Sequence, residues 1–212
     1  MKTILCYGDS NTWGYNPETF DRYPYDVRWT GRLQAVLSDC RVLECGLNGR
    51  TTAFSDPLEP GRNGLKYLPI ALKTHDPIDL MLLMLGTNDC KCRHGVNAEE
   101  IALGMERLIL TAQAVTLWGG RSNPRILVIA PPRMDMDGLE GSPMAAAFDK
   151  TSEQKSRRLA ACYAPLCKRL GVDFFDAGAV VPSMGPIDGT HLSADGHAAL
   201  AQALAGLIPT LL

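Results

Sequence analysis

Short apolar runs alternate with longer segments of helical periodicity along this chain, and that alternation restricts the possible folds most. The clearest run, residues 79–85 (DLMLLML), is apolar after its first residue and is bounded by turn signals. Such a run is typical of a central strand that is covered on both faces. Strands that alternate with helices favour a parallel sheet between two helical layers. We therefore expect an α/β fold. The periodicity does not reveal the order of the strands in the sheet.

The remaining elements follow from apolar spacing, caps and breakers. Predicted strands span 2–7, 41–45, 79–85, 125–130 and 172–176. Predicted helices span 29–37, 67–72, 97–118, 151–170 and 194–207. Asn97 and Ser193 are the expected N-caps of the helices at 97–118 and 194–207. Thr151 or Ser152 is the expected N-cap of the helix that ends at 170, and Gly171 is its expected C-cap. Long loops are expected at 14–28, 50–65 and 133–150.

Length and charge exclude several classes of protein. The chain has 212 residues, of which 46% are hydrophobic, and this suits one domain that spans 1–212. A net charge of -2 argues against a nucleic-acid partner and against a polybasic membrane tether. No apolar run reaches the roughly 20 residues of a membrane span.

Two further features point to the cytoplasm. Ser10 lies too close to the N-terminus for a cleavable signal peptide, which takes roughly 15–30 residues, to precede it. The seven cysteines are odd in number and lack framework spacing, so we expect free thiols in a reducing compartment.

A candidate nucleophile follows the first predicted strand. The sequence Tyr-Gly-Asp-Ser-Asn-Thr at 7–12 turns sharply after that strand and can present the Ser10 hydroxyl at the carboxyl edge of the sheet. Serine alone is a weak nucleophile and needs a base. We also expect Asp9, Asn11 and Trp13, which flank Ser10, to contact the substrate, with Trp13 as an apolar pocket wall or else a core residue.

A candidate base lies near the other end of the chain. His191 precedes the last predicted helix, and Asp188 stands three residues before it, so one turn can bring the carboxylate to the ring. A histidine oriented by a carboxylate is the usual activator of serine. The elbow motif G-x-S-x-G of α/β-hydrolases is absent, because Gly8-Asp9-Ser10-Asn11-Thr12 lacks the second glycine.

Donors for an oxyanion complete the requirement. We expect the backbone N–H groups of Ser10 and Gly49 and the side-chain amide of Asn88 to serve, since each residue follows a predicted strand. One such donor contributes on the order of 10²–10³ in rate.

Together these blocks resemble the SGNH-hydrolase, or GDSL-type esterase, family over essentially the whole chain. The stretches at 8–14, 27–30, 46–52 and 84–89 are similar to its bacterial arylesterase/acyltransferase branch. The resemblance implies a five-stranded, flavodoxin-like, three-layer α/β/α fold, no metal or cofactor, and assembly into homo-oligomers. It implies hydrolysis of short acyl esters, and acyl transfer to alcohols or peroxide. It also implies that Ser10, His191 and Asp188 form the triad. The 133–150 loop does not obviously follow this branch.

Other interpretations stay open at this point. Carbohydrate O-deacetylation uses the same machinery, and a non-catalytic domain that binds a small ligand fits the same fold. Cys90, Cys92 and His94 have alternating spacing that could hold a metal, but no second half of a zinc site accompanies them. Of the two remaining histidines, His75 is expected to be structural. His197 is expected to be either a surface residue or a packing residue.

Overall fold

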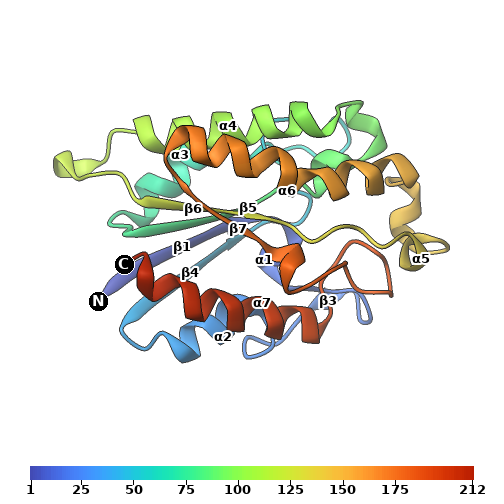
Figure 1. Cartoon of the computed structure of the whole chain (residues 1–212), viewed down its shortest axis with the longest axis horizontal. Coiled ribbons are helices and arrows are strands. Elements are labelled where there is room, and N and C mark those ends of the chain that lie inside the picture. The colour runs from blue at the N-terminus through green and yellow to red at the C-terminus, as the bar shows by residue number, and fades with distance from the viewer.

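A five-stranded parallel sheet forms the centre of the computed structural model, which describes residues 1–212 and every side chain except that of Met136 (Figure 1). Its strands are Lys2–Gly8 (β1), Cys40–Gly46 (β4), Leu80–Met84 (β5), Arg125–Ala130 (β6) and Asp173–Asp176 (β7). They lie in the order β4-β1-β5-β6-β7. The chain therefore leaves β1 in one direction and returns on its other side at β5. That reversal is the flavodoxin-like switch point, beside which open α/β sheets bind ligands.

Helices cover both faces of this sheet, and the fold is the expected three-layer α/β/α arrangement (Figure 1). On one face lie α2 (Trp29–Val36) and α7 (Ala194–Leu207). On the other lie α3 (Gly64–His75), α4 (Ala98–Ala114) and α6 (Lys150–Leu170). Among the described residues, none of these helices combines the length and the apolarity that crossing a membrane would take.

The central strands are buried on both faces, as their apolar sequences predict. In β1, Tyr7 packs in the core beneath α4, whereas its neighbour Cys6 packs in the core above α2 and α7. In β5, Met81 and Met84 divide between the same two cores. This alternation arises because successive side chains of a strand point to opposite faces. Each fully buried side chain of this size contributes roughly 1.5–3 kcal/mol to folding.

The ends of the helices follow local capping chemistry. Asn97 accepts from the Glu100 N–H, and the Glu100 carboxylate accepts from the Asn97 N–H, which confirms the predicted start of α4. Ser193 caps α7 and Gly171 ends α6 in the left-handed conformation, again as predicted. The start of α6 was predicted wrongly. Its cap is Asp149, whose carboxylate accepts from the N–H of Ser152, so the helix begins at Lys150.

Several predicted loops and boundaries also differ. The helix predicted at 67–72 is longer because Asn63 caps it at Gly64. The helix predicted to reach 118 stops at Ala114, where Val115 becomes extended. Two of the predicted loops contain short elements. The 14–28 loop contains β2 (Tyr15–Asn16) and β3 (Asp21–Arg22). The 133–150 loop contains α5 (Met136–Leu139) and the 3₁₀ turn η4 (Pro143–Ala146).

Candidate active site

The turn after β1 holds Ser10 at the switch point of the sheet. Ser10 begins α1 (Ser10–Trp13), and the Asp9 carboxylate caps this single turn by accepting from the Asn11 N–H at 2.9 Å. Gly8 is required here, because a Cβ at that position would lie 2.0 Å from the Thr12 hydroxyl. The first N–H groups of a helix lack an acceptor within it. The Ser10 N–H, at the start of α1, therefore has no acceptor within this helix.

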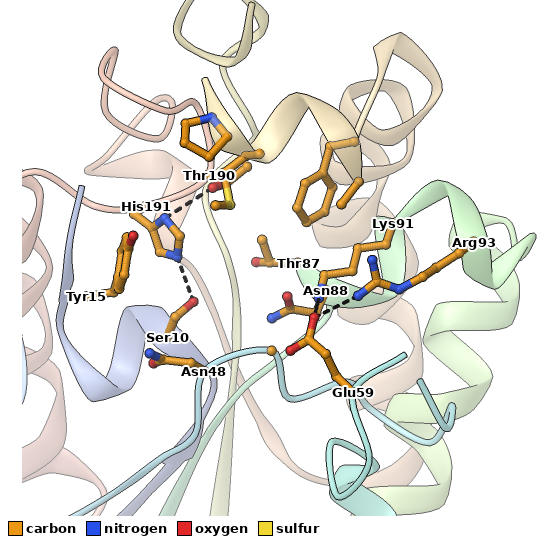
Figure 2. A pocket seen from close by; sticks show the side chains of 15 residues that line it. Ser10, Tyr15, Asn48, Glu59, Thr87, Asn88, Lys91, Arg93, Thr190 and His191 are labelled. Atoms are coloured by element: carbon orange, nitrogen blue, oxygen red, sulfur yellow. Dashed lines mark hydrogen bonds and ion pairs between the residues drawn. The ribbon is translucent and has the colours of Figure 1, made fainter. Parts of the chain in front are cut away.

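The structure brings Ser10, His191 and Asp188 into one chain of hydrogen bonds. The Ser10 Oγ lies 2.9 Å from His191 Nε2 (Figure 2). His191 Nδ1 lies 2.6 Å from Asp188 Oδ2. The other Asp188 oxygen accepts from the backbone N–H groups of Thr190 and His191, each at 3.0 Å. These bonds close the single turn that the three-residue spacing predicts.

The electrostatics of Asp188 favour its ionised form. Burial alone would raise the pKa of this carboxyl. The His191 ring and the two backbone N–H groups outweigh burial, so the pKa lies below its ordinary value. An ionised Asp188 fixes His191 with Nδ1 as donor and leaves Nε2 free to accept the Ser10 proton. On its other side the His191 ring packs against Tyr15, with 4.3 Å between ring centroids.

Gly49 and Asn88 face the same cavity as Ser10. Gly49 has a φ of +79°, and a Cβ there would lie 2.9 Å from the Glu59 carboxylate, so a side chain does not fit. The Asn88 side-chain amide donates to the Arg50 carbonyl at 3.2 Å and lies 3.5 Å from an Asp9 oxygen. The three expected donors thus come from the ends of β1, β4 and β5.

Sequence reasoning missed Arg50, which lies beneath these donors. Its buried guanidinium donates to the carbonyls of Gly8, at 2.8 Å, and Cys45, at 2.5 Å. It also packs over the Tyr7 ring, 4.1 Å from the centroid. The pattern around Arg50 carries no signal of this role, because a charged residue after a glycine turn ordinarily faces solvent.

Asp89 is a second residue that the prediction missed. It is fully buried, and both of its oxygens accept from the Thr52 N–H, at 2.9 and 3.0 Å. Burial raises its pKa to about 7, and burial also raises that of nearby Asp9 to about 6. Asp89 thereby ties the Gly49–Thr52 segment to the turn that carries Asn88.

The expected substrate contacts of Asp9, Asn11 and Trp13 do not fit the structure. Asp9 and Asn11 are buried beneath the site, and Trp13 does not line the cavity but has Arg22 over its ring. Asn11 instead braces the segment that carries His191. Its amide donates to the Thr190 carbonyl at 3.1 Å and its oxygen accepts from the Leu192 N–H at 2.8 Å.

A cavity of about 300 Å³ opens above Ser10 and has two unlike walls. An apolar wall comes from the 133–150 segment and consists of Pro143, Met144, Ala147 and Phe148. The other wall is charged, with Glu59, Lys91 and Arg93 on the side away from Tyr15 (Figure 2). Long loops were predicted at 50–65 and 133–150, but no pattern in the sequence singled out the residues of either wall.

The charged wall is largely neutralised by ion pairs within the protein. Arg93 Nη2 lies 2.6 Å from Asp56 and 2.8 Å from Glu59, and Lys91 Nζ lies 3.3 Å from Glu59. Burial works to raise the pKa of Asp56, but the bonds from Arg93 and the Leu58 N–H, together with the charges of Arg93 and Lys91, outweigh burial and lower this pKa to about 2. We call Asp56, Glu59, Lys91 and Arg93 the ionic cluster.

The three residues considered as metal ligands, Cys90, Cys92 and His94, contact separate partners. Cys90 Sγ donates to the Gly86 carbonyl, Cys92 Sγ lies near Ser152, and the His94 ring lies 3.8 Å from Asp56. They do not converge as metal ligands would. His197 is fully buried, which corrects the surface alternative, and it accepts from the Trp29 N–H at 3.3 Å.

A Ser–His–Asp chain at the carboxyl edge of a parallel sheet, beside a cavity that Gly49 and Asn88 also line, is the arrangement of a serine hydrolase. Residues 6–199 match the model of the GDSL-like lipase/acylhydrolase family. The chain belongs to that family and is a carboxylic ester hydrolase, in agreement with the resemblance of its motifs. No curated protein sequence matches it.

Solved structures with similar folds cover the whole chain. The aryl esterase of M. smegmatis is 40% identical with a TM-score of 0.93. A putative arylesterase from Agrobacterium tumefaciens is 42% identical with a TM-score of 0.91, and a carbohydrate acetylesterase from Sinorhizobium meliloti is 37% identical with a TM-score of 0.92. Each comparison covers 100% of both chains.

Proposed function

We propose that the protein hydrolyses short-chain acyl esters of aryl and alkyl alcohols through an acyl-enzyme on Ser10. The observation that carries the proposal is the hydrogen-bonded chain from Ser10 Oγ through His191 to Asp188, with spacings of 2.9 and 2.6 Å. A cavity of about 300 Å³ with an apolar wall suits a small acyl group. Similarity to the M. smegmatis aryl esterase supports the same substrate class.

The proposed reaction has two steps. Ser10 Oγ attacks the ester carbonyl while His191 Nε2 takes its proton, and the alcohol leaves with that proton. Water then attacks the acyl carbon, passes a proton to His191, and releases Ser10 and the acid. The N–H groups of Ser10 and Gly49 and the amide of Asn88 stabilise the oxyanion in both steps, each contributing on the order of 10²–10³ in rate. An alcohol or peroxide in place of water would give acyl transfer.

Substitution of the nucleophile tests this proposal. Ser10→Ala should reduce turnover of a chromogenic short-chain ester at least about 10³-fold, because it removes the hydroxyl that His191 Nε2 contacts. The change removes one atom, so the thermal unfolding midpoint should stay near the wild-type value. Ser183→Ala is the control, because Ser183 lies on the loop after β7. A variant of Asn11 would not serve, because the Asn11 side chain braces the segment that carries His191. Substantial residual turnover by a folded Ser10→Ala protein would refute the assignment.

Carbohydrate O-deacetylation is a second candidate. The ionic cluster favours it, because carboxylate and ammonium groups along one wall can bind sugar hydroxyls. Similarity to the S. meliloti carbohydrate acetylesterase also supports it. A panel that compares acetylated sugars with aryl acetates separates the two, since the preferred substrate has the higher kcat/KM.

We propose in addition that the protein is a cytoplasmic homo-oligomer. Its seven cysteines are all unpaired in the structure, as in a reducing compartment. Large apolar side chains such as Leu103, Ile70 and Trp118 are exposed and support contact between copies. Light scattering that gives the mass of one chain, 23.0 kDa, at micromolar concentration would contradict the oligomer.

A further inference from the structure

A second cavity of about 290 Å³ adjoins the cavity above Ser10. The two share Tyr15, Pro143 and Met144, so these side chains stand between them. Whereas His191 lines the first cavity, Asp188 lines the second. The second cavity is therefore on the histidine side of the nucleophile, behind Tyr15.

Exposed apolar side chains border this second cavity. Phe20 is 66% exposed and Ile187 is 41% exposed, and both line it. Phe20 has a φ of +60°, a conformation that is costly for a bulky residue and uncommon outside glycine and asparagine. Its N–H donates to the Asn16 carbonyl at 2.9 Å, which holds the backbone of Phe20 in the turn of the β2–β3 hairpin. Pro17, from the same hairpin, adds a further apolar surface.

The chemistry of the proposed reaction gives the two cavities different roles. His191 Nε2 must pass its proton to the oxygen of the departing alcohol, so that alcohol leaves on the histidine side. The acyl chain then points the other way, toward Phe148 and the ionic cluster. Figure 2 shows this division: Tyr15 and His191 lie on one side of Ser10, and Glu59, Lys91 and Arg93 on the other.

We infer that the second cavity binds the alcohol part of the ester, and that the chain prefers esters of aromatic or branched apolar alcohols. This inference rests on the proposed esterase function and extends it to the leaving group. The same cavity would hold an acceptor alcohol during transfer. The oxygen of that alcohol would bond to the acyl carbon, its proton would go to His191, and the bond from the acyl carbon to Ser10 Oγ would break as Oγ takes that proton.

Substitution at the border of the cavity tests the inference. Phe20→Asn removes the ring with a residue that tolerates positive φ, and Ile187→Ser removes the second apolar contact independently. For each variant, kcat/KM is measured for benzyl acetate and for methyl acetate. The benzyl-to-methyl ratio should fall about tenfold, the low end of what a hydrophobic pocket contributes to discrimination. Val36→Asn, at a 66% exposed position on α2, is the matched control and should keep the wild-type ratio.

A second series of esters distinguishes the alcohol side from the acyl side. The ratio of kcat/KM for methyl butyrate to that for methyl acetate should stay at the wild-type value in both variants. If this acyl ratio falls while the benzyl-to-methyl ratio is kept, the cavity holds the acyl chain and the inference is overturned. If neither ratio changes, the cavity binds no part of the ester, although the esterase function stands. Only a wild-type protein that hydrolyses none of these esters would overturn the proposed function itself.

Discussion

At the scale of single residues, Arg50 connects the parts of the site that must stabilise an oxyanion. Its guanidinium binds the carbonyls that precede Asp9 and Gly46, and its own carbonyl accepts from the Asn88 amide. A planar guanidinium can hold two carbonyls in fixed positions, which a flexible lysine does less well. We infer that Arg50 is a positioning residue for the three oxyanion donors.

Replacing Arg50 by methionine tests this role. Arg50→Met keeps the length but removes both guanidinium hydrogen bonds, and the Gly8 carbonyl keeps only the Leu47 N–H as a donor. The loss should cost about 1–3 kcal/mol in stability. Displaced donors should lower kcat by at least about tenfold while KM changes less, because the oxyanion forms only in the transition state. Arg121→Met is the control, since Arg121 pairs with Asp76 at the surface. A destabilised variant with wild-type kcat at 25 °C would reduce Arg50 to a structural role.

At the scale of elements, local chemistry explains which parts of the fold were predictable. Runs such as 79–85 and caps such as Asn97 act over a few residues, so strands and helices were found with small errors at their ends. The sharp turn at Ser10 and the short turn from Asp188 to His191 are equally local. Their motifs therefore indicated the three side chains that the structure brings together.

Contacts between distant segments were not predictable in this way. Tyr15, in β2, lies against His191 from near the other end of the chain, and Phe148, between η4 and α6, lines the cavity. Neither residue belongs to a pattern with a fixed spacing from Ser10. The wrong expectation that Asn11 contacts the substrate has the same cause, because its side chain binds the carbonyl of Thr190 from the far end of the chain.

The cap of α6 gives a prediction at this scale. Asp149 accepts from the Ser152 N–H at 3.0 Å and from the Thr151 hydroxyl at 2.6 Å, and these bonds hold its pKa below the ordinary value. Asp149→Ala should lower the free energy of unfolding by about 1 kcal/mol, as for other N-caps, and Asp149→Asn by less, because asparagine also caps. Urea denaturation at pH 7 measures both. Equal losses in the two variants would contradict the capping role.

At the scale of the whole molecule, three fully buried groups make stability depend on pH. Burial lowers the pKa of His197 to about 3 and raises those of Asp9 and Asp89 to about 6 and about 7. In the unfolded chain His197 takes up a proton below its ordinary pKa of 6.5, so its neutral form in the fold costs stability as the pH falls. The carboxyls act in the opposite direction, because the unfolded chain loses their protons above their ordinary pKa of 3.8.

Variants at two of these groups should therefore show opposite slopes. The stability of the wild type relative to His197→Asn should fall as the pH drops from about 6.5 toward 3, by up to about 1.4 kcal/mol per pH unit. The stability of the wild type relative to Asp89→Asn should instead fall as the pH rises from about 4 to about 7. Urea denaturation across this range gives both slopes. A pH-independent difference for His197→Asn would show that this histidine is not held neutral by the fold.

The account as a whole depends on one reactive hydroxyl. We would treat the protein with an aryl phosphonate, which bonds to an activated serine, and locate the adduct by peptide mass spectrometry. The account predicts one adduct, on Ser10, that forms at least about 10²-fold more slowly in His191→Gln, which lacks the general base. An unmodified protein, or an adduct on another serine with Ser10 free, would contradict it.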